Sequence, residues 1–220
     1  PLTRLAQPRD PAMIEVTWLV FVVASLVLIM TPGQDMMIVM SRSIAQGPGA
    51  GVATAASVSV GLVGHTILAT LGLGALLRAS EWLFLALKLV GAAYLVWLGV
   101  QLLRTKSAEL AVTRGAPRSR SRLFVDGALS NLSNPKIAIF YFAFLPQFVT
   151  PGASHPTLTI LVLGLLFAAL TFVIKGPVAV FAGRLSTWFQ SRPSALVALY
   201  RASGVVLVGL AVRLALARRD

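Results

Sequence analysis

Residues 29–37 read I-M-T-P-G-Q-D-M-M, and this stretch decides the fold. It lies inside an apolar run that is long enough to cross a membrane as a helix. Pro32 removes a backbone donor, Gly33 loosens the backbone, and Asp35 places an ionisable group where charge is costly. Broken backbone inside a bilayer is tolerated only where it packs in protein or lines a wet cavity. The stretch therefore indicates a substrate or ion site at an interrupted helix. The alternative is that the first helix ends at Met30 and Asp35 lies at the membrane interface.

Composition places the chain among integral membrane proteins. Of 220 residues, 57% are hydrophobic and 12% are charged, whereas soluble domains have about 45–50% apolar and 25% charged residues. The net charge of +12 does not indicate nucleic-acid binding, because the basic residues lie in short segments between the apolar runs. Cysteine is absent, which excludes thiol redox chemistry and disulfides. We expect an all-α integral membrane protein with no cofactor, no metal site and no nucleic-acid partner.

Residues 1–12 contain three prolines and no periodicity, so we interpret them as a disordered leader or as an extension upstream of Met13. Basic residues before an apolar run resemble a signal peptide, but no small-residue cleavage site stands out, and we expect a retained span. Residues 13–217 are predicted to form one transmembrane domain, followed by a short tail at 218–220.

Apolar runs separated by turns predict six membrane spans within this domain. The first is expected to be broken at 31–35, the fourth at 131–136, and the fifth to be interrupted at 175–177. The spans lie at about 15–41, 50–77, 82–103, 124–149, 157–181 and 195–216.

The second polar break reads N-L-S-N-P-K at 131–136. Asn131 and Asn134 are three residues apart and share a helix face, while Pro135 interrupts the backbone and Lys136 adds a charge. The proline breaks of the first and fourth spans fall at equivalent points of two three-helix halves. We therefore predict a 3+3 inverted repeat with broken first and fourth helices, a design found in many secondary transporters.

The long loop at 104–123 joins these halves and carries six basic residues against one glutamate. The positive-inside rule places this loop in the cytoplasm and both termini outside. Contact with anionic lipids is a second interpretation of the same charges.

Small residues recur four apart along the second span, in rows that let helix backbones approach closely. These faces serve packing within the bundle, between protomers of a homodimer, or both. His65 continues one row and is either a proton-carrying group or a histidine hydrogen-bonded within the bundle. Lys88 of the third span snorkels toward the near membrane surface in our interpretation. The rows are Gly47, Gly51, Ala55, Ser59 and Ala53, Ser57, Gly61.

Three motifs resemble one family. T-P-G-Q-D at 31–35 resembles the T-P-G-P-[DN] signature of the LysE/RhtB family of amino-acid exporters. G-A-A-Y-L-V-W-L-G-V-Q-L-L at 91–103 is similar to that family's third-span pattern, and N-P-K-I-A-I-F-Y-F-A-F-L-P-Q-F at 134–148 resembles its fourth-span signature. The order, spacing and six-span length agree across almost all of residues 13–217.

The resemblance implies a multi-pass exporter of amino acids or their derivatives in a bacterial inner membrane, driven by the proton-motive force. It also implies that Thr31, Pro32 and Gly33 meet the N-P-K residues in a central site. Gln34 departs from the family pattern, which usually has a second proline there, and adds an amide that can contact the substrate.

An amino-acid zwitterion needs two partners of opposite charge in a cavity of low dielectric constant. Asp35 is the natural partner of an ammonium or a proton acceptor, and Lys136 is the natural partner of a carboxylate, or of Asp35 when the site is empty. Export against proton entry follows if substrate and proton compete for Asp35. The alternative is a static ion pair between Asp35 and Lys136 that holds the two halves together.

Other functions fit the sequence less well. The chain has no H-E-x-x-H and no G-x-S-x-G motif, and its two histidines make an intramembrane enzyme improbable. A thiol reductase needs cysteine, and a metal-ion exporter would be expected to carry segments rich in histidine or acid. An exporter of another small metabolite and a non-transporting membrane subunit stay open as alternatives.

Overall fold

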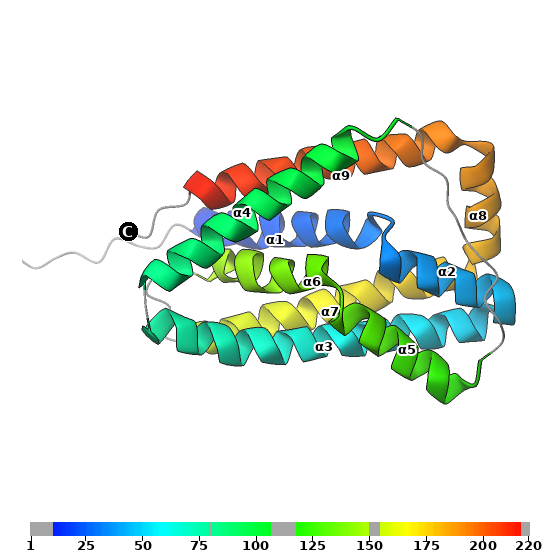
Figure 1. Ribbon diagram of the computed structural model, residues 1–220, viewed down its shortest axis with the longest axis horizontal. Coiled ribbons are helices and arrows are strands. Elements are labelled where there is room, and N and C mark those ends of the chain that lie inside the picture. The colour runs from blue at the N-terminus through cyan, green and yellow to red at the C-terminus, as the bar shows by residue number, and fades with distance from the viewer. Residues whose placement is uncertain (1–10, 80, 107–117, 150–154, 217–220) are drawn as a thin grey trace, which may run out of the picture.

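The computed structural model describes residues 11–79, 81–106, 118–149 and 155–216, and all the regular elements in these ranges are helices (Figure 1). The all-α prediction is therefore confirmed for the described residues. Residues 1–10 of the predicted leader, 107–117 of the long loop and the tail from 217 onward lie outside them. The elements are α1 (Pro11–Met30), α2 (Gln34–Gln46), α3 (Pro48–Ala79), α4 (Glu81–Leu103), α5 (Arg120–Leu132), α6 (Pro135–Ile139), η1 (Phe140–Phe144), η2 (Leu145–Phe148), α7 (Pro156–Val180), α8 (Ala182–Ser191) and α9 (Pro193–Leu216).

Three described helices are long and apolar enough to cross a membrane, namely those at Pro48–Gly72, Pro156–Val180 and Pro193–Val212. The pair Trp18–Met30 and Gln34–Gln46 passes the same test when taken together and counts as a fourth span. These helices identify a multi-pass membrane protein. The full set of six spans and the inverted repeat stay predictions.

The first apolar run is broken where the sequence predicts. α1 ends at Met30, and the Val27 carbonyl accepts hydrogen bonds from both the amide and the hydroxyl of Thr31, at 3.0 and 2.6 Å. Gly33 is extended, and α2 leaves at 52° to α1. α1 therefore ends at Met30, and Asp35 lies buried in the first turn of α2.

The second break divides the fourth predicted span into α5 and α6. Ser133 and Asn134 separate the two helices, and α6 runs on into a π-helical turn, η1, and a 3-10 turn, η2. A π-helical turn is uncommon and is found mostly at functional sites. In Figure 1 the junction of α1 with α2 and the junction of α5 with α6 both lie in the middle of the molecule.

Two expectations about the last third of the chain are wrong. Residues 175–177 do not interrupt the fifth span, because α7 continues through Pro177 to Val180. Proline removes one hydrogen bond from a helix, and the close packing of α7 along α3 holds the helix together across that gap. Residues 182–191, expected as part of a connecting loop, form the short helix α8.

The small-residue rows of α3 are used within the chain. A side chain on Gly51 would lie 2.6 Å from Cβ of Ser43 in α2, and one on Gly61 would lie 2.8 Å from the Ala128 carbonyl in α5. Such distances are too short for any Cβ, so α3 packs against both neighbours through bare backbone. Gly51 and Gly61 are therefore used for packing within the chain, and a homodimer stays a prediction.

A second close contact joins α4 to α9. A side chain on Gly204 would lie 2.7 Å from the Gly99 carbonyl, and one on Gly99 would lie 2.9 Å from the Gly204 carbonyl. The pair crosses one side of the molecule, with α3 and α7 paired on the opposite side and α1 between them (Figure 1).

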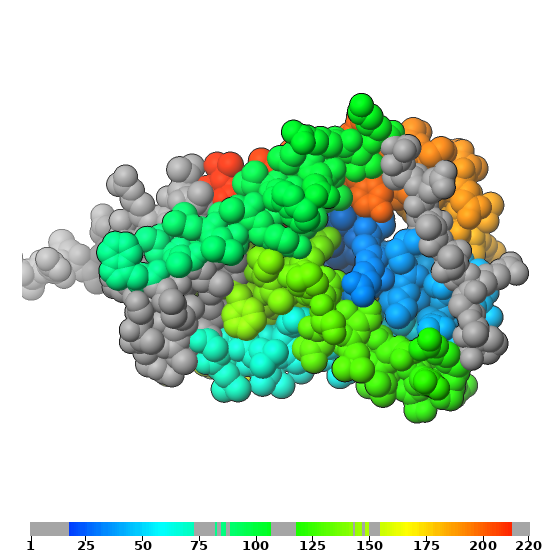
Figure 2. All heavy atoms as spheres, in the orientation of Figure 1, coloured from blue at the N-terminus to red at the C-terminus, as the bar shows by residue number. Residues whose placement is uncertain are grey.

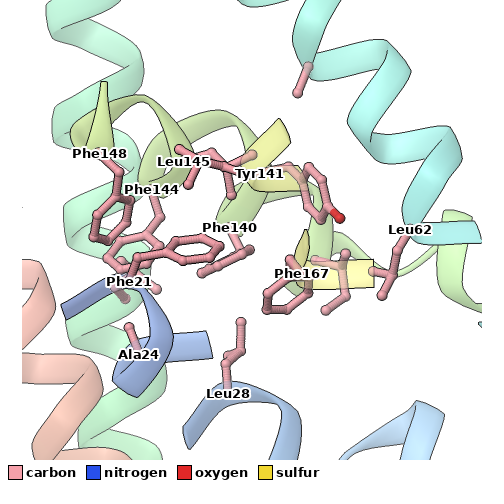
Figure 3. Close-up of a cluster of buried hydrophobic side chains, with 14 of the residues drawn as sticks. Phe21, Ala24, Leu28, Leu62, Phe140, Tyr141, Phe144, Leu145, Phe148 and Phe167 are labelled. Carbon is pink, nitrogen blue, oxygen red and sulfur yellow. The ribbon is translucent and has the colours of Figure 1, made fainter. Parts of the chain in front are cut away.

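Aromatic side chains fill the space between the helices. The rings of Phe140 and Phe167 are 4.7 Å apart, and those of Phe21 and Phe148 are 5.2 Å apart. Figure 3 shows Phe167, Leu62 and Leu28 at one edge of this cluster. These three residues also line the cavity described below, so the apolar core forms one wall of the polar site.

Candidate functional site

A cavity of about 40 Å³ lies where the two breaks meet. One water needs roughly 10–15 Å³ on this measure, so the cavity holds a few waters in the conformation seen here. Its polar lining comes from α2, α6, α7 and the two breaks: Thr31, Gly33, Gln34, Asp35, Asn134, Lys136, Thr171 and Lys175. Its apolar lining is Leu28, Ile29, Met36, Leu62, Ile137 and Phe167.

Asp35 is the buried acid of this cavity, with 5% of its surface exposed. Its Oδ2 accepts a hydrogen bond from Nδ2 of Asn131 at 2.7 Å and lies 3.3 Å from Nζ of Lys175. Its Oδ1 is buried and has no hydrogen-bond partner among the described residues. One oxygen of the carboxylate is thus held by the protein, and the other is left to a ligand or a water.

Lys136 is a second cation in the cavity wall. Its Nζ lies 3.9 Å from the position that a Cβ on Gly33 would occupy, so it faces the first break. The expected Asp35–Lys136 ion pair is wrong, because the described residues place Lys175, and not Lys136, within ion-pair distance of Asp35. The ion-pair partner of Asp35 comes from α7, and Lys136 has no carboxylate within ion-pair distance among the described residues.

The start of α2 also faces the first break. Gly33 has no side chain that can cap the helix, and no described side chain caps its first turn. The first backbone N–H groups of a helix have no partner within it, and the N-terminal end carries a partial positive charge. These donors add to the positive potential that Lys136 brings to the same side of the cavity.

Asn131 and His65 continue the polar network into the bundle. The Asn131 carbonyl accepts a hydrogen bond from Nε2 of His65 at 3.2 Å, and the His65 ring stacks on Tyr141 at 5.6 Å. Oδ1 of Asn131 and Nδ1 of His65 are buried and unpartnered among the described atoms. The hydrogen-bonded interpretation of His65 is confirmed, while a role in proton transfer stays a prediction.

The remaining predicted site residues lie in the two breaks, at the start of α2 and in α4. Pro32 is buried in the first break, and Pro135 occupies the first turn of α6. Gln34 is exposed, and its Nε2 donates to Oγ of Ser130 at 2.9 Å, which joins the start of α2 to α5. Figure 2 shows α2 reaching the surface beside α5, and Gln34 is the exposed residue of the cavity lining on α2. Lys88 lies in α4, and its side chain is outside the described residues.

Sequence reasoning missed Lys175. The sequence predicts a helix break at 175–177, although a lone lysine within a long apolar run is itself a signal of a functional or paired charge. Thr171, one turn before it on α7, was also missed, and its hydroxyl donates back to the Phe167 carbonyl at 2.8 Å. Many other serines and threonines lie within the apolar runs, so nothing in the sequence distinguishes Thr171 as a site residue.

The described residues contain no group of three or more His, Asp, Glu or Cys side chains that could hold a metal ion. The site is instead one carboxylate, two ammonium groups and a helix N-terminus around a small cavity inside a multi-pass helical membrane protein. This arrangement defines a multi-pass membrane protein with a polar, charged cavity inside its helical bundle. The chain belongs to the LysE type translocator family, whose model matches residues 26–218.

Relatives support the same assignment. The chain is 35% identical over 202 residues to a homoserine/homoserine lactone efflux protein of Salmonella typhimurium, covering 91% of this chain and 97% of the relative. It is 31% identical to an uncharacterized membrane protein of Pseudomonas aeruginosa, over 90% and 94% of the two chains. It is 27% identical to a leucine efflux protein of Klebsiella pneumoniae, again over 90% and 94%. The protein is therefore a transporter and not an enzyme, and no solved structure matches it.

Proposed function

We propose that the protein exports amino acids, or close derivatives of them, from the cytoplasm across a bacterial inner membrane, and that the proton-motive force drives this export. The names of the efflux relatives support the substrate class and the direction. The observation that carries the proposal is the cavity at the two breaks, which one carboxylate and two ammonium groups line together.

The charges of this cavity suit a zwitterion. The substrate's ammonium group binds the unpartnered Oδ1 of Asp35. Its carboxylate binds the ammonium of Lys136 and the free N–H groups at the start of α2. Asn131 orients Asp35 through their 2.7 Å hydrogen bond, and Asn134 positions Lys136 by capping α6.

The same cavity favours neutral side chains. Two lysines face one aspartate, so a substrate with a cationic side chain would add a third ammonium to a site that has no described acid to receive it. Leucine, isoleucine, methionine and phenylalanine side chains form the apolar wall. The cavity is smaller than an amino acid, so we infer that the helices on either side of the breaks move apart when substrate enters.

The transport direction sets the topology that we propose. The basic loop at 104–123 lies in the cytoplasm, and both termini lie outside, with six spans arranged as two inverted halves around the cavity. The paired breaks before α2 and α6, each followed by a helix N-terminus, support this arrangement.

The test is efflux from proteoliposomes that contain the purified protein and a mixture of amino acids, homoserine lactone and other small metabolites, read by mass spectrometry. We expect neutral amino acids to leave, several-fold faster when the outside is made more acidic than the inside. Efflux of neither amino acids nor their derivatives under any gradient would contradict the proposal. Homoserine lactone has no carboxylate for Lys136, and we expect it to leave more slowly than homoserine.

A further inference from the structure

The buried ion pair between Asp35 and Lys175 places an ammonium group of the protein where the substrate's own ammonium has to bind. Nζ of Lys175 lies 3.3 Å from Oδ2 of Asp35, and the two side chains are 6% and 7% exposed. Lys175 thus acts toward the carboxylate as an amino-acid substrate would. Asp35 is the one described acid within ion-pair distance of it.

The other charged and titratable groups around Lys175 do not replace Asp35. Lys136, on α6, repels it across the cavity. His65, on α3, hydrogen-bonds the Asn131 carbonyl. The cavity wall from α1 contributes Thr31 and apolar side chains. When a substrate ammonium takes Asp35, the Lys175 ammonium is therefore left buried without a counter-charge.

We propose that Lys175 carries the proton that couples transport: substrate binding displaces it from Asp35, and its ammonium releases one proton. The inference rests on the proposed function and adds the coupling group to it. A buried charge without a partner is strongly unfavourable, and a lysine relieves this by becoming neutral. One N–H bond of Lys175 breaks, its electron pair stays on Nζ, and the proton passes through cavity water to the side from which the substrate entered.

The charge balance gives an exchange of one substrate for one proton. The empty site holds Asp35 as carboxylate with Lys175 and Lys136 as ammonium groups. The loaded site holds Asp35 and Lys136 paired with the zwitterion, and Lys175 neutral. Loading from the cytoplasm releases a proton there, and release of the substrate outside lets Lys175 take up a proton from that side. Return of the empty site carries this proton inward, so each exported amino acid admits one proton.

Lys175 fits this role better than Asp35 does. Asp35 has an ammonium partner in both the empty and the loaded site, so its counter-charge is the same throughout the cycle. When the substrate ammonium replaces the Lys175 ammonium at Asp35, it is Lys175 that loses its counter-charge. Lys175, and not Asp35, is therefore the group that changes its charge.

Proton release on binding tests the inference. Purified protein is titrated with L-homoserine and L-leucine by calorimetry in two buffers with different ionisation enthalpies, which gives the number of protons released per substrate bound. We expect about one proton for the native chain and none for Lys175→Gln or Lys175→Arg. Arginine preserves the ion pair with Asp35 and stays protonated. If Lys175 were only structural, Lys175→Arg would behave as the native protein does; if Lys175 carries the proton, this variant cannot release one. Lys106→Gln, at an exposed position three residues after the end of α4, is the matched control and should release the native number of protons.

The outcomes separate this inference from the proposed function. Native protein that exports amino acids but releases no proton on binding would overturn the role of Lys175 and leave the export function standing. A Lys175→Arg variant with native proton release and native gradient-driven efflux would also overturn it. Native protein that neither binds nor exports any amino acid would overturn the proposed function itself. If Lys175→Gln does not fold, the arginine variant, which keeps the charge of the pair, decides the question.

Discussion

The break before α2 and the break before α6 both contain a proline, but they leave the following helix in different states. At the second break, Oδ1 of Asn134 accepts a hydrogen bond from the Lys136 amide at 3.1 Å, and the helix start is satisfied from within the chain. At the first break, Gly33 supplies no cap, and the buried Oδ1 of Asp35 is also unpartnered among the described atoms. Because Asn134 caps α6, the second break needs no ligand to satisfy its helix start. The first break has no such cap, so the amides at the start of α2 are available to a ligand.

The comparison assigns different tasks to the two halves of the site. The second break holds Asn131 and Lys136 in place, and these residues then face the first break. In the proposed function, the first break supplies the carboxylate and the free amides that bind the substrate. Substitutions of the groups that bind substrate, including Lys136, should therefore change transport more than stability, and substitution of the capping residue of the second break should do the reverse.

The largest effect is expected from Asp35→Asn. The change removes the anionic partner of the substrate ammonium and of Lys175, so gradient-driven efflux should fall by about 100-fold or more. Asparagine has nearly the same shape and keeps the fold, which size-exclusion chromatography and thermal unfolding would check. Efflux at the native rate with the native dependence on the gradient would sink the role of Asp35.

Lys136→Gln should have the next largest effect. Loss of a charged hydrogen bond to the substrate carboxylate should raise the KM for amino acids about 10-fold or more. Homoserine lactone, which has no carboxylate, should be transported as by the native protein, so the ratio of the two substrates is the readout. Equal changes for homoserine and its lactone would show that Lys136 does not recognise the carboxylate.

Gly33→Ser tests the uncapped helix start itself. Serine can cap α2 and occupy its free amides, so we expect KM to rise a few-fold while thermal stability stays the same or rises by a few tenths of a kcal/mol. Gly33→Ala is the matched control, because φ is −148° and the nearest atoms to a new Cβ lie 3.9 Å away. Identical KM values for the serine and alanine variants would argue against binding at these amides.

The smallest transport effect is expected from Asn134→Ala. Removal of the α6 cap should lower the free energy of unfolding by about 1 kcal/mol. KM should change by less than about threefold, since in the proposed function Asn134 acts on the substrate only by positioning Lys136. Unfolding of the detergent-solubilised protein with temperature, set beside efflux rates, measures both. A variant as stable as the native chain but with efflux as low as that of Asp35→Asn would reverse the tasks assigned to the two breaks.

The sequence predicts much of this arrangement, because a proline or a charge inside a membrane-spanning apolar run is tolerated mainly where it is packed in protein or lines a polar cavity. Pro32 and Pro135 mark breaks that the structure contains, and the residues around them meet at one cavity, although they are about a hundred positions apart. Composition and the long apolar runs predict the helical class in the same direct way.

The pairing of charges could not be predicted in this way. A sequence shows that Asp35 needs a cation, but Lys136 and Lys175 are both placed on helices that reach the cavity, and only their packing decides which one contacts the acid. Pro177 was misleading for a related reason, because packing along α3 keeps α7 helical where local preference predicts a break.

Protection of a single cysteine by substrate tests the central claim most directly. The chain contains no cysteine, so Gln34→Cys, at the first break, and Ser133→Cys, at the second, each introduce one exposed thiol into the native background. The rate of labelling by a small hydrophilic thiol reagent is measured with and without L-homoserine or L-leucine. We predict that substrate slows labelling at position 34 several-fold and leaves position 133 unchanged. Labelling at position 34 that is the same with and without a substrate the protein exports would contradict binding at the first break.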